Sequence, residues 1–346
     1  MFDTSEITGC KREEEFYIKS ALARSKIASA ILKFRERRFA STAHLKKLRI
    51  SIVQYLNTAP LVWGFTNGPL QGKYDLSFTV PSQCAEALRA GAADIAIIPA
   101  IEYQRIDDLV VLPDLAIASK HRVRSLLLIA KKPIAQVRHI ALDRSSRSTQ
   151  ALTRILCAEH WKIKPEFIEA DPDLNVMLRV AEAALLIGDP ALRLSVAIEG
   201  AAKRGAAGEQ LCAGSSVGVS AGQNLYVYDV VEQWRHMTNL PAVLAIWAGR
   251  RDVLSPEVAT DFAASRDFGM AHITEISSAA SGEMQLLPAV LADYLRQNID
   301  FSLGAENRKG LDLYFRLAAK QQLIPAVKIV EWAAADATVM SSQAVS

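Results

Sequence analysis

From Leu48 onward, short apolar runs alternate with stretches of helical spacing, and each run has the length of one strand. Continuous apolar runs separated by helices are typical of strands buried on both faces of a sheet. The sequence predicts a helix from Pro81 to Leu88, with Ser82 as its N-cap. The strands predicted around it are Arg49–Val53, Leu76–Val80, Ile95–Ile98, Leu109–Leu112 and Arg124–Ala130. This order indicates an α/β architecture with much parallel pairing.

A second series of strands and helices begins after Lys132-Pro133. It comprises a strand at His139–Leu142, a helix from Gln150 to His160 and a strand at Ala183–Ile187. A later apolar strand, Val243–Trp247, is expected to return to the first series. The sequence therefore predicts two lobes, one at 48–133 plus 245–346 and the other at 134–244, joined by two crossing strands. A ligand cleft is expected between them.

Residues 1–47 differ in kind from the rest of the chain. Residues 1–48 contain eleven Lys and Arg against six Asp and Glu, and apolar residues recur between Phe16 and Phe39 at roughly helical spacing. We predict a poorly ordered or helical N-terminal extension. Three interpretations stay open: a basic helix on a membrane surface or a partner, a loosely packed extension, or a start codon assigned too far upstream.

Composition narrows the possible functions. The net charge is +3, and with +5 in residues 1–48 the remainder is slightly acidic, which gives no support for nucleic-acid binding. The four cysteines, Cys10, Cys84, Cys157 and Cys212, have no zinc-ligand spacing, so no metal is expected. No apolar run reaches membrane-spanning length, so no integral membrane segment is expected. No secretory signal is recognisable, so we expect a cytoplasmic protein. We expect it to be a monomer or a homodimer.

Candidate chemistry lies where the predicted strands end, because ligands of open α/β sheets bind beyond the carboxyl ends of strands. The polar residues at these positions are Asn57, Ser82, Glu102, Ser125 and Asp189. Each also has an ordinary structural interpretation, since Asn forms turns and Ser, Asp and Glu occur at helix starts. The sequence contains no GxSxG or HExxH motif, and its six histidines form no cluster.

The turn Ser145–Thr149 is the strongest candidate for ligand binding. Hydroxyl groups at a helix start, next to unpaired backbone N–H groups, favour an anion. Arg147 could add a bidentate contact to a carboxylate. The alternative is that Ser145 or Ser146 only caps the helix. Because no glycine-rich phosphate-binding loop is present, a carboxylate is expected rather than a nucleotide.

The segment Tyr55-Leu56-Asn57-Thr58-Ala59-Pro60-Leu61 resembles the YLN-x-x-PL motif of the chorismate dehydratases of the futalosine route to menaquinone. The resemblance covers about residues 48–332, with mild departures at Ser148-Thr149, which reverses the usual order, and at Asn239, which replaces a usual Gly. The further matches are Pro81-Ser82 to Gly91-Ala92-Ala93-Asp94, Ile101-Glu102-Tyr103, Val123-Arg124-Ser125, Ala141-Leu142-Asp143 with Ser145-Ser146-Arg147-Ser148-Thr149, Leu186-Ile187-Gly188-Asp189-Pro190-Ala191-Leu192, and Tyr228-Asp229 with Trp234, Thr238, Leu240-Pro241 and Trp247.

The resemblance implies a two-lobed type II periplasmic-binding-protein-like fold used as a cytoplasmic enzyme. Its activity would be that of a carbon–oxygen lyase that removes water from chorismate to give 3-[(1-carboxyvinyl)oxy]benzoate, without a cofactor. Three alternatives stay open: a carboxylate-binding protein of the solute-binding type, the sister naphthoate synthase of the same pathway, and the ligand-sensing domain of a regulator.

For this reaction we expect Asn57 and Ser125 to hold the substrate and its leaving hydroxyl group. The proton acceptor is expected to be either Glu102 or a carboxylate of chorismate itself. The remaining expected substrate-binding residues are Ser82, Ser146, Arg147, Ser148, Thr149, Gly188 and Asp189. One substrate carboxylate would lie at the Ser146–Thr149 helix start and the other near Ser82.

Overall fold

The computed structural model describes residues 47–203 and 225–333, which contain two separate five-stranded sheets. The N-terminal extension expected at 1–47 lies, except for Lys47, outside the described residues. Among the described residues, no helix is long and apolar enough to cross a membrane.

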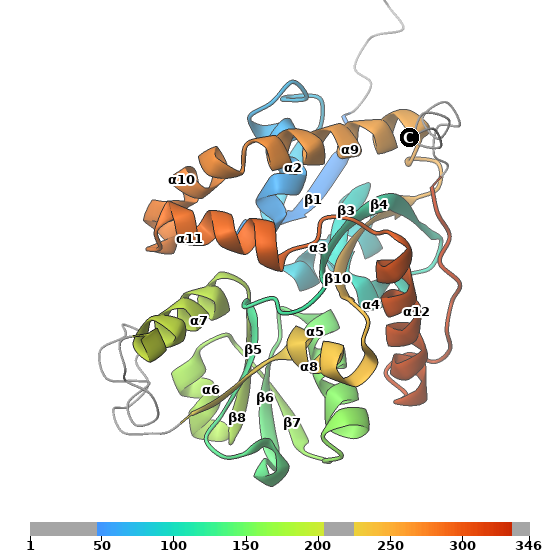
Figure 1. The fold of residues 1–346 in the computed structure, drawn as a ribbon. Helices are drawn as coiled ribbons and strands as arrows, with labels where there is room; N and C mark the ends of the chain where they lie inside the picture. Colours follow the sequence, from blue (N-terminus) through green and yellow to red (C-terminus); the bar gives the residue numbers. More distant parts are fainter. Residues whose placement is uncertain (1–46, 204–224, 334–346) are drawn as a thin grey trace, which may run out of the picture. The chain divides into compact units, whose positions relative to one another are not determined.

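The first sheet has the strand order β2-β1-β3-β10-β4 (Figure 1). Strand β1 pairs in parallel with β2 and β3, whereas β10 is antiparallel to both β3 and β4. The strand expected at Val243–Trp247 is thus part of β10 and lies between strands that precede it by more than a hundred residues. The bounds are β1 (Arg49–Val53), β2 (Asp75–Thr79), β3 (Ile95–Pro99), β4 (Leu109–Ser119) and β10 (Ala242–Arg250).

The second sheet has the order β7-β6-β8-β5-β9, with β6 parallel to β7 and β8, and β5 antiparallel to β8 and β9. Strand β5 differs from expectation, because the boundary at residue 133 assigned it to the lobe of the first sheet. An apolar run buried on both faces looks the same in either sheet, so its pattern cannot tell which sheet it joins. The bounds are β5 (Leu126–Ala130), β6 (His139–Asp143), β7 (Glu166–Ala170), β8 (Ala183–Ile187) and β9 (Tyr226–Asp229).

Helices cover the sheets and connect their strands. Helix α5 and the π-helical turn η3 together contain the helix expected at Gln150–His160, but α5 begins three residues earlier. Ser82 is not an N-cap, because α3 begins at Pro81 after Val80. The helices are α2 (Ala59–Thr66), α3 (Pro81–Arg89), α4 (Ala100–Tyr103), α5 (Arg147–Ile155), α6 (Leu174–Val180), α7 (Gly188–Lys203), α8 (Val230–Thr238), α9 (Pro256–Ala271), α10 (Ile273–Met284), α11 (Pro288–Asp293) and α12 (Ala305–Lys320), with the short turns η1 (Leu56–Thr58), η2 (Ile134–Gln136), η3 (Leu156–His160) and η4 (Tyr294–Asn298).

Helices α2 and α9 pack unusually closely beside the first sheet. A Cβ atom added to Gly64 in α2 would lie 2.6 Å from the Cα of Ser265 in α9, so a larger residue has no room there. The rings of Phe65 and Phe262 meet edge to face with centroids 5.0 Å apart, and Trp247 of β10 packs against Phe262 in the same way. This packing fixes the loop between β1 and α2, which carries Asn57.

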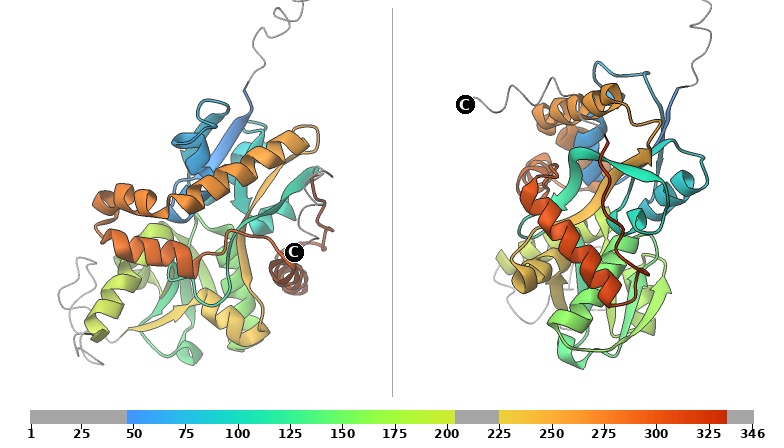
Figure 2. Two further views of the ribbon diagram at one scale, coloured as in Figure 1. Left: turned by 45° about the horizontal axis from the view of Figure 1, so that its top comes forward. Right: turned by 90° about the vertical axis from the view of Figure 1, so that its right-hand side faces the viewer.

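Helix α12 contacts elements next to both sheets. It packs against β10 of the first sheet and against α5, which follows β6 of the second sheet (Figures 1 and 2). The hydroxyl group of Tyr314 in α12 donates a hydrogen bond of 3.0 Å to the backbone oxygen of Ser148 in α5. The C-terminal part of the chain thus holds the start of α5, where ligand binding is expected.

Candidate active site

The predicted residue Ser125 lies next to the end of β8 because β5 is antiparallel to that strand. Leu126 is paired with Ile187, and the backbone N–H of Gly188 donates a 2.8 Å hydrogen bond to the carbonyl oxygen of Ser125. Ser125, directly before β5, and the residues directly after β8 therefore lie at the same edge of the second sheet. Ser125 and Asp189, both predicted from strand ends, are brought to the same place.

Tyr294 connects Ser125 to the loop that follows β1. It lies in η4, and its hydroxyl group donates a 2.9 Å hydrogen bond to the hydroxyl oxygen of Ser125. Burial raises the pKa of Tyr294, while hydrogen bonds with Ser125 and Asn57 act in the opposite direction. Asn57, Ser125 and Tyr294 therefore form one cluster of neutral hydrogen-bonding groups, drawn from three distant parts of the chain.

Asp189 lies in the first turn of α7 and contacts the same loop. The backbone N–H of Leu56 donates a 3.1 Å hydrogen bond to Asp189 Oδ1, directly before Asn57. Burial raises the pKa of Asp189 to about 6, and the Leu56 hydrogen bond and Arg193 act against this shift. The site thus holds one carboxyl group that titrates near neutrality beside a cluster of neutral donors.

Gly188 is required by the close approach of Tyr55. Its φ of +67° suits glycine, and an added Cβ would lie 2.7 Å from the Tyr55 ring. Gly188 therefore lets the loop after β1 pack directly on the start of α7. The structure shows this packing role, and substrate binding by Gly188 stays a prediction.

The hydroxyl groups of the Ser145–Thr149 turn are already hydrogen-bonded within the protein. Ser146 Oγ donates to Thr149 Oγ1 at 2.8 Å, and Ser148 Oγ accepts a 3.2 Å hydrogen bond from the backbone N–H of Ile101. The carbonyl oxygen of Ser145 accepts a 3.0 Å hydrogen bond from the backbone N–H of Ser82. These contacts connect the start of α5 to α3 and α4. The groups that stay available to an anion are the backbone N–H groups in the first turn of α5.

Glu102, the expected proton acceptor, is held by three guanidinium groups. Its side chain is fully buried and forms ion pairs with Arg89, with Arg105 at 2.9 Å and with Arg147 at 3.0 Å. Arg147 also pairs with Glu86 at 2.7 Å, so its guanidinium binds two protein carboxylates rather than lying open to a ligand. This arrangement suits a structural contact between α5 and the helices α3 and α4 better than proton abstraction.

Sequence reasoning missed Tyr294 and Arg193. No motif marks Tyr294, which is 169 residues from Ser125 along the chain. Arg193 lies one helical turn after Asp189, so the i, i+4 spacing was the only available signal. Tyr294 contacts Ser125, and Arg193 follows Asp189 in α7, so both lie beside residues predicted from the strand ends.

A cavity of about 630 Å³ extends from Asp189 across the loop after β1. Its size is in the range of small-molecule sites. The side chains that line it come from β1 and its following loop, α2, β2, α7 and α10: Val53, Gln54, Tyr55, Leu56, Ala59, Val62, Trp63, Thr66, Asn67, Phe78, Asp189, Arg193, Ala280, Glu283 and Met284. Arg193 is the only cationic side chain among these lining residues, which also include the carboxyl groups of Asp189 and Glu283, so an anionic group in the cavity would bind on its Arg193 side.

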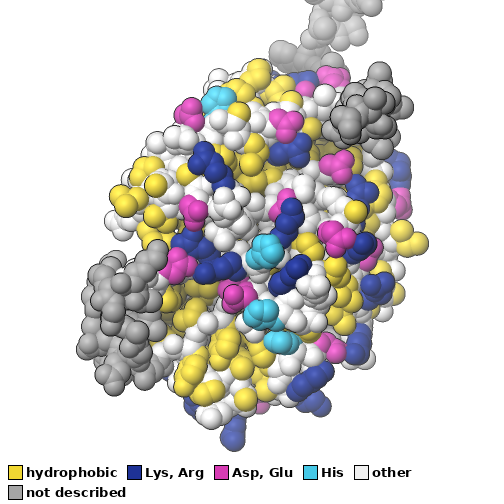
Figure 3. All heavy atoms as spheres, in the orientation of Figure 1, with side chains coloured by type: hydrophobic (Ala, Val, Ile, Leu, Met, Phe, Trp, Pro, Cys, Tyr) yellow, Lys and Arg dark blue, Asp and Glu magenta, His cyan; other side chains and the backbone are white. Residues whose placement is uncertain are grey.

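Two further observations bear on the kind of ligand. On the face seen in Figure 3, Lys and Arg side chains are interspersed with Asp and Glu, so this face has no continuous basic field for a nucleic acid. Among the described residues, no group of three or more His, Cys, Asp or Glu side chains is arranged to hold a metal ion.

Comparisons with solved structures identify the fold. A protein from Archaeoglobus fulgidus, 18% identical, covers 81% of this chain and 100% of its own with a TM-score of 0.60. The periplasmic aliphatic sulphonate binding protein of Escherichia coli, 14% identical, covers 84% of this chain and 94% of its own with a TM-score of 0.52. The chain therefore has the two-lobed α/β fold of periplasmic binding proteins, as predicted.

Comparisons of sequence point to one family. A chorismate dehydratase from Thermus thermophilus is 26% identical over 267 residues, which are 77% of this chain and 93% of that protein. A family model described as menaquinone biosynthesis matches residues 48–320, which include every predicted site residue. Since that match spans most of the chain, the protein belongs to the menaquinone biosynthesis family.

Proposed function

We propose that this protein is a chorismate dehydratase, a hydro-lyase that removes water from chorismate to give 3-[(1-carboxyvinyl)oxy]benzoate. The observation that carries the proposal is the cluster of Asn57, Ser125 and Tyr294 beside Asp189, in a chain of the menaquinone biosynthesis family. The relative from Thermus thermophilus bears the same activity in its name. The proposal keeps the cytoplasmic location expected from the sequence.

The reaction needs orientation and charge stabilisation more than a strong electrophile. A ring C–H bond beside the enol ether breaks, the C–O bond of the neighbouring hydroxyl breaks, and a ring double bond forms as water leaves. Aromaticity supplies the driving force. Neutral donors held in place by buried contacts suit this task, because they stabilise developing charge without reorganising. Tyr294 holds Ser125 in this way, while Asn57 lies in the short helical turn η1 after β1.

Chorismate has two carboxylates, and the backbone N–H groups of the first turn of α5 are proposed to bind one of them. The hydroxyl groups of Ser146, Ser148 and Thr149 then shape that turn through their mutual and backbone hydrogen bonds. Arg193, in the cavity lining, is proposed to attract the other carboxylate.

The proton acceptor is proposed to be a carboxylate other than Glu102, since both oxygens of Glu102 accept from guanidinium groups. Two carboxylates lie close enough to the Asn57 loop: Asp189, which contacts it at Leu56, and a carboxylate of the substrate itself; Glu283, which also lines the cavity, is exposed to solvent. Asp189 is the stronger candidate within the protein because its pKa of about 6 is close to the pH at which it would act.

The experiment is incubation of the purified protein with chorismate, followed by ultraviolet absorbance and mass spectrometry. The expected product is aromatic and lighter than chorismate by one water molecule. The Asn57→Ala and Ser125→Ala variants should form it much more slowly, whereas Arg179→Gln, an exposed change in α6, serves as the matched control. Binding of chorismate without conversion would indicate a solute-binding protein and would overturn the proposal.

A further inference from the structure

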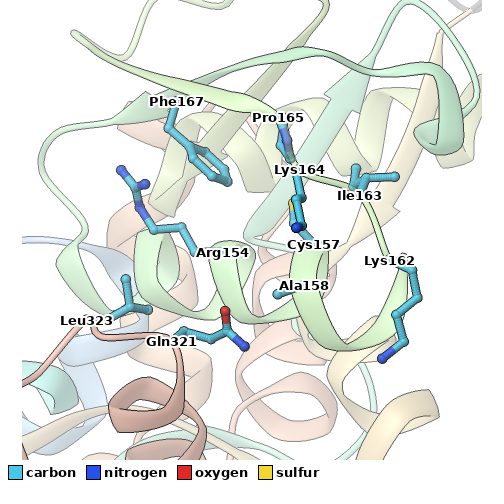
Figure 4. A pocket seen from close by; sticks show the side chains of 10 residues that line it. All are labelled: Arg154, Cys157, Ala158, Lys162, Ile163, Lys164, Pro165, Phe167, Gln321 and Leu323. Atoms are coloured by element: carbon cyan, nitrogen blue, oxygen red, sulfur yellow. The ribbon is translucent and has the colours of Figure 1, made fainter.

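A second cavity, of about 580 Å³, shares no lining residue with the first. Figure 4 shows the side chains that line it. Its lining comes from α5, η3, the loop before β7, β7 itself and the segment after α12. The residues are Arg154, Cys157, Ala158, Lys162, Ile163, Lys164, Pro165, Phe167, Gln321 and Leu323. Three of them are cationic and none is acidic, so the lining favours an anion.

Arg154 is the central polar group of this cavity. Its guanidinium carbon lies 4.2 Å from the centroid of the Phe167 ring, and Figure 4 shows the two side chains next to each other at one side of the cavity. Within residues 47–203 and 225–333, Arg154 forms no hydrogen bond and no ion pair within 4 Å. A partly buried guanidinium stacked on an aromatic face, with its N–H donors unused, is arranged to receive a planar anion.

Two acidic side chains lie near the cavity without pairing with Arg154: Glu169, which is exposed on β7 and attracts the guanidinium only through its charge, and Glu159. Glu159 accepts hydrogen bonds from Lys320 at 3.0 Å and from Gln321 at 2.6 Å, and Lys162 lies 4.0 Å from it. Glu159 therefore does not supply the missing partner of Arg154. Burial lowers the pKa of the Arg154 guanidinium although the charge of Glu169 acts in the opposite direction, so a carboxylate bound directly to Arg154 would stabilise its charge further.

The other walls are apolar. Ile163, Pro165, Phe167 and Leu323 line the cavity together with the buried thiol-bearing side chain of Cys157. Burial raises the pKa of the Cys157 thiol to about 12, so this side chain stays neutral and adds no anionic charge. A ligand that matches the site must combine one negative charge with a flat apolar body.

We propose that this cavity is a second binding site, separate from the catalytic cleft, for an aromatic carboxylate whose carboxyl group pairs with Arg154. The ligand's ring packs against Phe167 and the aliphatic wall, while Lys164 contributes a second positive charge. The volume suits a one- or two-ring acid. Helix α5 contains Arg154 and begins at the Ser146–Thr149 turn. A ligand in this cavity therefore contacts the same helix whose first turn is proposed to bind a carboxylate in the cleft.

The test is isothermal titration calorimetry with 2-naphthoate, compared with the uncharged 2-naphthylmethanol. Arg154→Gln should weaken 2-naphthoate binding by roughly 10- to 100-fold, because a hydrogen-bonded charge pair is lost. Lys164→Gln should weaken it by a smaller factor, and the matched control Arg179→Gln should leave it unchanged. The alcohol should bind wild-type protein as weakly as the acid binds Arg154→Gln.

An Asn57→Ala variant separates this cavity from the cleft. The expected result is that Asn57→Ala binds 2-naphthoate as wild type does, whether or not the protein turns over chorismate. Loss of binding in Asn57→Ala with retention in Arg154→Gln would assign the ligand to the cleft and overturn the inference. Absence of saturable binding up to about 1 mM would overturn it as well. If Arg154→Gln fails to fold, the inference is overturned when Lys164→Gln binds 2-naphthoate as tightly as wild type does.

Discussion

The hydroxyl group of Tyr294 donates a 2.9 Å hydrogen bond to the hydroxyl oxygen of Ser125, and each residue is only 1% exposed. A hydroxyl group at Ser125 can rotate freely unless a partner fixes it. Tyr294 provides that partner from η4, so its contribution to the reaction is positioning rather than direct contact with the reacting atoms. The same residue reaches Asn57, which links both proposed substrate-holding groups.

Tyr294→Phe should therefore lower kcat by about tenfold with little change in KM, since one neutral hydrogen bond is lost while the ring is kept. Steady-state kinetics with chorismate measure both constants. Tyr103→Phe is the matched control, because its buried ring is similar but its hydroxyl group bonds Ile329 and Glu331. Wild-type kcat in Tyr294→Phe would contradict the positioning role.

Asn57→Ala and Ser125→Ala should each lower kcat by roughly 10²–10³, the range observed when one preorganised donor is removed. Both variants should keep the fold, because Asn57 is partly exposed, whereas Ser125→Ala removes one acceptor of the buried Tyr294 hydroxyl group and should cost about 1–3 kcal/mol of stability. Single-turnover kinetics and circular dichroism separate the two effects. Retention of wild-type kcat by both variants, with intact folding, would remove these residues from the site.

Glu102→Gln should destabilise the fold while leaving kcat of the folded protein near that of wild type. The change removes the buried charge that Arg89, Arg105 and Arg147 share. Because these guanidinium groups are partly exposed and can be solvated, the loss should be about 1.5–3 kcal/mol, the range for hydrogen bonds to a charged group. Urea unfolding gives the free energy, and kinetics at low temperature give kcat. A fall in kcat beyond about 10³ in stably folded protein would restore Glu102 as the proton acceptor.

Much of the fold follows from local patterns, because apolar runs and helix-start signals report strands and helices directly. The strands at Arg49–Val53, Ile95–Ile98 and Ala183–Ile187 all appear within one residue of their expected positions. The assignment of Leu126–Ala130 to the first lobe was wrong, since the partner of a fully buried strand is decided by tertiary packing.

The site was predicted in part, for a related reason. A linear pattern identifies Asn57, Ser125 and Asp189 each as a residue at a strand end. Ser125 and Asp189 flank β5 and β8 of the second sheet, whereas Asn57 follows β1 of the first, so their meeting depends on how the two sheets pack. The partners of Glu102 come from three other positions in the chain, so no local signal distinguished a bridged carboxylate from an open one. Long-range partners decide a side chain's role, and they appear only in the folded protein.

Asp189 allows a test of stability against pH. Its pKa is raised from 3.8 to about 6 in the folded protein, so the folded state binds the proton more tightly than the unfolded state. The stability associated with this group is therefore greatest below about pH 4 and is lost as the pH rises to about 6. The loss reaches about 3 kcal/mol at neutral pH. Asp189→Asn, which keeps an oxygen for the Leu56 N–H, should escape this loss.

The same variant decides whether Asp189 accepts the proton. Urea unfolding at several pH values should show Asp189→Asn gaining stability over wild type between about pH 4 and pH 7, which establishes that the carboxyl group titrates as described. If Asp189 is the acceptor, kcat of wild type should rise with pH through about 6, because only the ionised carboxylate can take the proton. Asp189→Asn should then lose more than about 10³ in kcat and show no such rise. If instead the variant gains stability as expected but retains kcat within about tenfold of wild type, the carboxylate of chorismate is the acceptor, and Asp189 serves to hold the loop at Leu56 beside Asn57.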